Sequence, residues 1–290
     1  GDEVITPPNS FIASTAVIVH LGAKPVFVDV LPDQNIDSGK IEAAITEKTR
    51  AIMPVHLTGR ICDMDPIIEI ARKYNLKVIE DAAQAIGSKY RGKPSGSLGH
   101  VGCFSVHPLK NLSACGDGGF LTTNDENLYK KAKSLRNHGI VERDRVDSFG
   151  YVSRMDNLQA AILNYRLKKL DQIIEKRRIN AKCYFEYIDT PQVKLPIEQE
   201  KELNSYHTFV IQVKSRNKLK DYLFSKGIET AIHYPTPIHL QPAAEKLGYR
   251  SGDFPITEKQ SKKILTLPVN QSLNQVDIKF VSKILNEFYC

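Results

Sequence analysis

The sequence predicts an α/β protein, with a mostly parallel central sheet covered by helices on both faces and a smaller α+β domain at the C-terminal end. Three observations indicate this class. Short apolar runs alternate with helix-like segments through the first half, which is the βαβ pattern of a parallel sheet. A long helical stretch follows, and a shorter set of strand-like and helix-like segments comes after it. The length of 290 residues accommodates both parts.

The first half contains short strand-like runs separated by segments of helical character. The expected strands span residues 4–6, 25–29, 51–55, 77–80 and 101–106. The expected helices span residues 10–21, 38–44 and 63–74. In the last of these, Ile67, Ile70, Ala71 and Tyr74 follow the i, i+3, i+4, i+7 spacing of one helix face. These elements predict a large domain over residues 1–170.

The second half begins with apolar residues at helical spacing over residues 155–187, which predicts one long helix or two in succession. Thr190-Pro191 ends this pattern. A strand over 208–213 and helices over 219–226 and 276–288 are expected next. We therefore expect a small α+β domain over residues 171–290, entered through the long helix.

Composition narrows the class of protein. No run approaches the roughly 20 apolar residues that cross a bilayer, and the N-terminus lacks a basic region followed by an apolar stretch, so we expect a cytoplasmic protein without a membrane partner. The five cysteines are scattered without a CxxC pair, so neither disulfides nor a metal site is expected. The formal charge is +7, but basic residues are interleaved with acids, so no nucleic-acid partner is expected.

Two ionisable residues follow successive expected strands. Asp81 comes directly after the strand at 77–80, and Lys110 follows the strand at 101–106, with a glycine-rich run at 116–119 behind it. Open α/β proteins bind ligands at the carboxyl ends of their strands. A buried carboxylate there holds a pyridine nitrogen protonated, and a lysine carries an aldehyde as a Schiff base. Taken singly, each residue fits a structural role better, Lys110 as a solvated lysine and Asp81 as a helix N-cap.

Asp81 and Lys110 belong to a series of short sequence motifs that follow one another along the chain. They lie at residues 1–5, 9–14, 25–29, 54–57, 79–85, 104–111 and 154–162. With these motifs the chain resembles the pyridoxal phosphate-dependent nucleotide-sugar aminotransferases, often called the DegT/DnrJ family. The resemblance implies the type I fold of pyridoxal phosphate-dependent transferases, with pyridoxal 5′-phosphate as the cofactor.

The resemblance also implies roles for single residues. Asp81 matches the partner of the pyridine nitrogen, and Lys110 matches the Schiff-base lysine. Phe11 matches the aromatic residue that stacks on one face of the cofactor, Gln84 the contact to its other face or 3-hydroxyl, and Ser105 a phosphate ligand. A core phenylalanine and a serine bonded to backbone are the structural alternatives for Phe11 and Ser105.

Substrate contacts are expected from His107 and from a C-terminal loop that contains His233, Tyr234 and His239. A packed or solvent-exposed histidine is the alternative at each histidine position. Val152 departs from the family pattern, which has an asparagine there that reaches the phosphate of the neighbouring subunit. A valine side chain has no hydrogen bond to offer. The resemblance nevertheless implies a homodimer with sites at the interface.

The implied reaction moves an amino group from an amino acid, by family habit glutamate, to a keto group of a nucleoside-diphosphate sugar. It would serve amino-sugar, polysaccharide or secondary-metabolite synthesis, with the keto position and the nucleotide left open. A sugar dehydratase with the same cofactor is one alternative, but such relatives carry histidine at the position of Lys110. A noncatalytic cofactor-binding regulatory protein is another. The chain also resembles the family without its N-terminal segment, which implies that a phosphate-binding loop is missing and the cofactor is bound more weakly.

Overall fold

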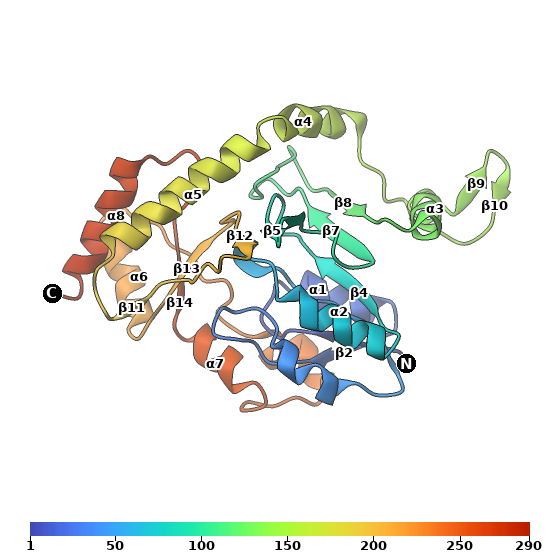
Figure 1. Cartoon of the computed structure of the whole chain (residues 1–290), viewed down its shortest axis with the longest axis horizontal. Coiled ribbons are helices and arrows are strands. Elements are labelled where there is room, and N and C mark those ends of the chain that lie inside the picture. The colour runs from blue at the N-terminus through green and yellow to red at the C-terminus, as the bar shows by residue number, and fades with distance from the viewer.

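A six-stranded sheet forms the centre of the N-terminal half in the computed structural model, which describes all 290 residues (Figure 1). The strand order is β2-β1-β3-β4-β7-β8. The strands are β1 (Glu3–Thr6), β2 (Lys24–Phe27), β3 (Thr49–Ile52), β4 (Lys77–Asp81), β7 (Val101–Ser105) and β8 (Gly119–Thr122). The first five are parallel, and β8 pairs with β7 in the antiparallel sense. The expected parallel α/β sheet is confirmed.

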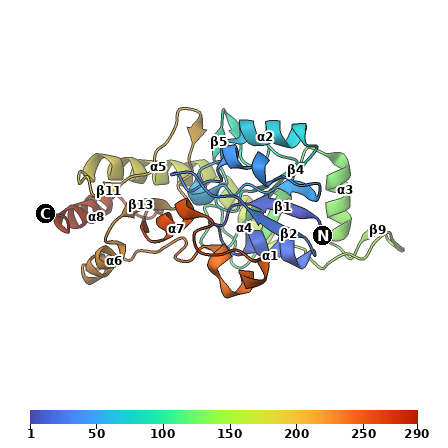
Figure 2. The same cartoon turned by 90° about the horizontal axis from the view of Figure 1, so that it is seen from below.

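Helices cover both faces of this sheet, with α1 (Ala13–His20) on one side and α2 (Met64–Lys73) on the other (Figure 2). Helix α2 buries Met64 and Ile67 against a core that includes Ile52 of β3. The helix expected over 38–44 is absent. Two 3₁₀ turns, η1 (Ser38–Lys40) and η2 (Glu42–Ala44), replace it, because the Asp37 carboxylate accepts from the Gly39 amide and glycine disfavours helix.

The long helical stretch is two helices, α4 (Asn157–Leu167) and α5 (Leu170–Tyr187). Beyond α5, the strands β11 (Val193–Lys194), β13 (Phe209–Val213) and β14 (Ile264–Leu267) form an antiparallel sheet. It packs with α5, α6 (Arg216–Ser225) and α8 (Gln275–Glu287) around a second core that contains Phe209, Ile211 and Leu265. The strand at 208–213 and the two later helices agree with the sequence pattern to within a few residues.

Several short elements have no counterpart in the sequence pattern. They are β5 (Lys89–Tyr90), β6 (Lys93–Pro94) and β12 (Glu202–Leu203), the turns η3 (Leu57–Gly59), η4 (Ile238–Leu240) and η5 (Pro242–Leu247), the helices α3 (Glu126–Leu135) and α7 (Pro255–Ser261), and the hairpin β9 (Ile140–Glu142) and β10 (Arg145–Val146). Strands of two or three residues are too short to show a period. Helix α3 and the hairpin lie at one end of the molecule (Figure 1).

The C-terminal half returns to the first sheet through residues 238–261. The Asp29 carboxylate, just after β2, accepts from the backbone amides of Ile256 and Thr257 and from the Thr257 hydroxyl, and so caps α7. Phe27 packs with Ile238 and Phe254 beside this cap. A division of the chain at residue 170 remains a prediction. None of the helices has the length and apolar character that crossing a membrane requires.

Candidate active site

Asp81 and Lys110 lie at the same edge of the central sheet. Strands β4 and β7 are adjacent and parallel, with Asp81 in register with Cys103, so the turn after β7 begins beside the end of β4. In that turn the Lys110 amide donates to the carbonyl of His107 at 2.8 Å. Burial lowers the pKa of the Lys110 amine, and the nearby negative charge of Asp81 opposes this shift in part. The structure therefore brings the predicted carboxylate and lysine together.

The Asp81 carboxylate is held from two directions. The hydroxyl of Ser14, on α1, donates to Oδ2 at 2.6 Å, and the amide of Ala83 donates to Oδ1 at 3.1 Å. The main chain is fixed as well, because the His56 amide donates to the Asp81 carbonyl at 3.0 Å. Ser14 lies in the motif at 9–14, but its role as a partner of Asp81 was not anticipated. A carboxylate with two such donors keeps one orientation.

A fully buried pair of side chains, Glu80 and His56, lies directly behind Asp81. Glu80 Oε2 is 3.0 Å from His56 Nε2, and neither side chain is exposed. Backbone amides of Gly96, Leu98 and Gly99 also donate to this carboxylate, at 2.6–2.8 Å. Burial alone would raise the pKa of Glu80, but the contacts with His56 and these amides outweigh it and lower the pKa. The carboxylate of Glu80 is thus a structural charge that fixes the end of β4.

Gln84 joins three separate parts of the chain. Its Oε1 accepts from the backbone amide of Thr58 at 2.8 Å, and its Nε2 donates to the hydroxyl of Tyr234 at 3.2 Å. The ring centroid of Tyr234 lies 6.0 Å from that of Phe11. Phe11 and Tyr234 line a hollow of about 510 Å³, and Phe11 is 58% exposed, so its ring is free to cover a ligand. Burial raises the pKa of the Tyr234 hydroxyl to about 12 and keeps it protonated.

Ser105 and two of the predicted histidines also lie near Lys110. Ser105 Oγ accepts from the His107 amide at 3.3 Å, which leaves the hydroxyl proton available to a ligand. His107 is half-buried, and its Nδ1 accepts from the Leu109 amide at 3.2 Å. His233 Nδ1 lies 2.9 Å from the Thr266 hydroxyl. Burial, and then the charge of Lys110, lower the pKa of His233.

His239 is not brought to this group. It is 2% exposed and lies in the segment 238–261 that returns to the first sheet. Its Nε2 is 3.1 Å from Oε1 of Glu258, and its ring packs against Phe254. A buried imidazole that is paired in this way holds α7 and its neighbours in place. The geometry therefore lends no support to a substrate contact from His239.

His207 lies near Lys110, although the sequence offered no chemical reason to select it. Its segment is anchored by Asn111, whose Nδ2 donates to the Ser205 carbonyl at 3.2 Å, and by Arg177, which donates to the His207 carbonyl at 3.0 Å. The imidazole Nδ1 is buried without a partner. Burial, followed by the charge of Lys110, lowers the pKa of His207 well below its usual value. Only the packing of residues 205–208 against the turn after β7 reveals this neighbour.

Comparison with known proteins identifies the family. Residues 1–286 match the DegT/DnrJ/EryC1/StrS aminotransferase family. The chain belongs to this family. It is 44% identical to the dTDP-3-amino-3,6-dideoxy-alpha-D-galactopyranose transaminase of Aneurinibacillus thermoaerophilus, over 99% of this chain and 79% of that one. It is 43% identical to a pleiotropic regulatory protein of Geobacillus stearothermophilus, over 100% and 79%.

The solved structures agree with this membership. The crystal structure of DesV of S. venezuelae in complex with a ketimine intermediate superposes with a TM-score of 0.96 at 36% identity, and covers 99% of this chain and 78% of that one. Other matching structures are those of Spr1654 of Streptococcus pneumoniae, in its pyridoxal phosphate (PLP) form and its pyridoxamine phosphate (PMP) form. This aminotransferase is therefore a pyridoxal phosphate-dependent enzyme of the type I fold.

The residues of the aminotransferase fit this cofactor. Besides the carboxylate and the lysine, the region offers buried polar atoms that lack partners in the protein, namely Asn9 Nδ2, Asn111 Oδ1 and His207 Nδ1. Asn9 precedes Phe11 by two residues and Asn111 directly follows Lys110. Buried polar atoms are nearly always paired, so unpaired atoms beside the predicted site are consistent with a polar ligand that supplies the partners.

Proposed function

We propose that this aminotransferase moves an amino group from an amino acid, glutamate in the first instance, to a keto group of a nucleoside-diphosphate sugar. The observation that carries the proposal is the partly buried Lys110 side chain beside the Asp81 carboxylate at the carboxyl edge of the sheet. The relatives support the substrate class, because one is named as a dTDP-aminosugar transaminase and another as a UDP-2-acetamido-2-deoxy-3-oxo-D-glucuronate aminotransferase. Their names differ in nucleotide and sugar, so the proposal stops at the class.

Lys110 and Asp81 take the two central roles. Bound pyridoxal phosphate supplies an aldehyde carbon and a ring that withdraws electrons. The Lys110 amine would hold the aldehyde carbon until the amino donor displaces it. The released amine would then move a proton from the donor α-carbon to the carbon that had been the aldehyde. Its lowered pKa increases the fraction that is uncharged and able to accept that proton. Asp81 keeps a proton on the ring nitrogen, and Ser14 orients the carboxylate for this task.

The surrounding residues would position the ligands. Phe11 would cover one face of the cofactor ring. Gln84, held by its hydrogen bonds with Thr58 and Tyr234, would contact the other face or the 3-hydroxyl. The Ser105 hydroxyl donates to the phosphate. His107, His233 and Tyr234 contact the sugar substrate, whereas the position of His239 supports a structural role only.

A homodimer is part of the proposal. Large apolar side chains are exposed around the hairpin and α4, and Phe149, Tyr151, Val152 and Leu158 are each more than 60% exposed. Such a patch is typical of a protein interface. Val152 bridges Asn137 in the main chain and offers no side-chain donor, so another group of the interface would complete the phosphate contacts.

The proposal is tested by incubating the pyridoxal phosphate-loaded protein with glutamate and a panel of nucleotide keto-sugars. We expect glutamate to convert the bound cofactor to its amine form, and a keto-sugar from the panel to restore the aldehyde form as the amino sugar appears. Absorbance follows the form of the cofactor in both half-reactions, and mass spectrometry detects the amino sugar. A regulatory binder, which the name of the relative from G. stearothermophilus suggests, would keep the aldehyde form in glutamate. A dehydratase would release water from the sugar without consuming glutamate.

A further inference from the structure

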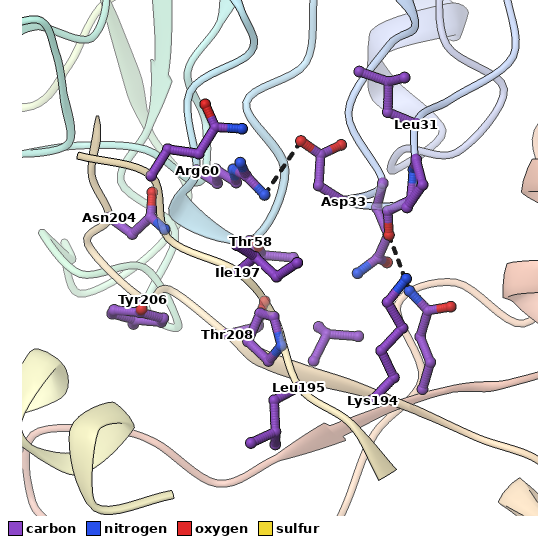
Figure 3. Close-up of a pocket in the computed structure, with 16 residues that line it drawn as sticks. Leu31, Asp33, Thr58, Arg60, Lys194, Leu195, Ile197, Asn204, Tyr206 and Thr208 are labelled. Carbon is purple, nitrogen blue, oxygen red and sulfur yellow. Dashed lines mark hydrogen bonds and ion pairs between the residues drawn. The ribbon is translucent and has the colours of Figure 1, made fainter. Parts of the chain in front are cut away.

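A second cavity lies at the junction of the two halves of the chain, apart from Lys110 and Asp81 (Figure 3). Its volume is about 240 Å³. Its walls come from the loop after β2, the turn after β3, the segment at 194–199 and the residues around the start of β13. Neither Asp81 nor Lys110 lines it. Pockets for drug-sized ligands measure roughly 300–1,000 Å³, so this cavity is too small for a complete nucleotide sugar.

Three neutral polar side chains that line the cavity carry buried atoms without any partner. They are Gln34 Oε1, Asn204 Oδ1 and Thr208 Oγ1. Gln34 is 6% exposed and Asn204 is 5% exposed. Buried polar side chains in folded proteins are nearly always paired. Three unpaired ones around a single cavity indicate a site that is shaped for a ligand with hydrogen-bonding groups.

The backbone around the cavity is also unusual. Gln34, Thr58 and Tyr206 have φ angles of 76°, 65° and 45°, in the left-handed region that glycine favours. All three residues line the cavity. Residues in such conformations cluster at ligand sites, where the surrounding structure holds them. Here they turn three separate segments toward one space.

Charge and shape define the kind of ligand. The guanidinium of Arg60 is occupied, since it lies 3.2 Å from Asp33 and 2.9 Å from Glu202, and Figure 3 shows the pair with Asp33. It is not available to bind an anion. Leu195 and Ile197 add apolar surface to the lining. The cavity thus combines buried neutral hydrogen-bonding groups with apolar surface, and its one unpaired cation, Lys194, is exposed to solvent.

We propose that this cavity binds a small uncharged molecule that has adjacent hydrogen-bond donors and acceptors along one edge and an apolar face. A nucleobase or nucleoside and a neutral monosaccharide share this chemistry. The side-chain amides of Gln34 and Asn204 each offer a donor and an acceptor, and the Thr208 hydroxyl offers both. The ligand satisfies the atoms that the protein leaves unpaired.

The site is connected to the active site through Thr58. The Thr58 amide donates to Gln84 at 2.8 Å, and the Thr58 carbonyl accepts from the Thr208 amide at 3.2 Å. Both threonines line the cavity. An occupant therefore contacts the segment that positions Gln84.

The test measures binding of uridine and of D-glucose to the pyridoxal phosphate-loaded protein by calorimetry and ligand-observed NMR. We expect one of the two to bind, and Thr208→Val and Asn204→Leu each to weaken it about tenfold, as expected for one lost hydrogen bond. Thr190→Val, at a partly buried threonine outside the cavity, serves as the matched control and should leave binding unchanged. If uridine binds, uridine monophosphate should bind no more tightly, because the Arg60 guanidinium is already paired and the other cation of the lining, Lys194, is exposed to solvent.

Failure of both probes to bind at millimolar concentration would overturn the proposal. So would binding that neither variant weakens, or a clear preference for the monophosphate, since these results place the ligand elsewhere. The stability of the unliganded protein supplies a second criterion. Replacing an unpaired buried hydroxyl by a methyl group is neutral or stabilising, so Thr208→Val should keep or raise the melting temperature. A marked fall would show that the hydroxyl is already bonded within the protein.

Discussion

The hydroxyl of Ser14 donates to the Asp81 carboxylate over 2.6 Å, and so joins helix α1 to the end of β4 across 67 residues of sequence. A hydrogen bond to a charged group is stronger than one between neutral groups. This bond holds the carboxylate that is proposed to protonate the cofactor ring. The two residues lie in elements separated along the chain by β2, β3 and α2, yet their side chains are in direct contact.

Replacing Lys110 with alanine should abolish aminotransfer, by roughly 10²–10⁴-fold or more, because the proton shuttle at the donor α-carbon is lost. Borohydride reduction should attach the cofactor to the peptide that contains Lys110 in the parent and to none in the variant. Lys93→Ala, at an exposed lysine in β6, is the matched control and should behave like the parent. Activity near the parental level in Lys110→Ala would remove the lysine from the mechanism.

Asp81→Asn should keep the cofactor bound but slow the reaction with glutamate by about 10²–10⁴-fold, since a neutral amide does not hold the ring nitrogen protonated. Asparagine has the same shape, its one oxygen accepts from the Ala83 amide, and the Ser14 hydroxyl accepts from the new amide nitrogen in place of donating. Cofactor affinity and the single-turnover rate are measured separately. A rate close to that of the parent would make Asp81 a structural cap.

Ser14→Ala should lower the single-turnover rate about 10- to 100-fold, because a hydrogen bond to a charged group contributes about 1.5–3 kcal/mol. Thr15→Val tests the neighbouring position on the same helix, where the buried hydroxyl has no partner. We expect that control to react at the parental rate. Equal losses in the two variants would mean that α1 acts through packing alone.

The pKa of Lys110 should fall further when Asp81 is replaced with asparagine. Burial lowers this pKa below 10.5, and the negative charge of Asp81 raises it, so removing the charge favours the neutral amine. The pH dependence of Lys110 acetylation in cofactor-free protein, followed by mass spectrometry, measures the shift. An unchanged or higher pKa in the variant would show that the two groups are not electrostatically linked.

The contacts of Glu80 should make the protein less stable in acid. The folded-state pKa of Glu80 lies below its usual value of 4.5, so its contribution is fully present above that value and is lost as the pH falls through the folded pKa. Glu80→Gln should lower the free energy of unfolding by about 1.5–3 kcal/mol near neutral pH, because hydrogen bonds to a charged acceptor become neutral ones. It should also make the stability depend less on pH in the acid range. Glu69→Gln, at an exposed position on α2, is the control for denaturation measured across pH. If the stability of Glu80→Gln fell with decreasing pH as steeply as that of the parent, Glu80 would not be the source of the acid sensitivity.

The positions of the two central site residues follow from the local sequence pattern of the strands that precede them. Asp81 is the last residue of β4 and Lys110 lies in the turn after β7, and the carboxyl ends of adjacent parallel strands lie at one edge by geometry. Strand and helix periods depend on the residues within each element, so they are visible in the sequence. The same reasoning failed at residues 38–44, where one side-chain contact, from Asp37 to the Gly39 amide, replaces a helix with turns.

The partners of these residues were decided by tertiary structure alone. Gln84 meets Tyr234 across 150 residues, and His207 reaches the surroundings of Lys110 because Asn111 and Arg177 hold its segment there. The periodicity of a single strand or helix does not predict such contacts, since they depend on how the two halves of the chain pack. His239 shows the converse, because it lies in the same loop region as Tyr234 but is drawn into a buried pair with Glu258. Sequence pattern determined which strands end in reactive groups, and long-range packing determined what surrounds those groups.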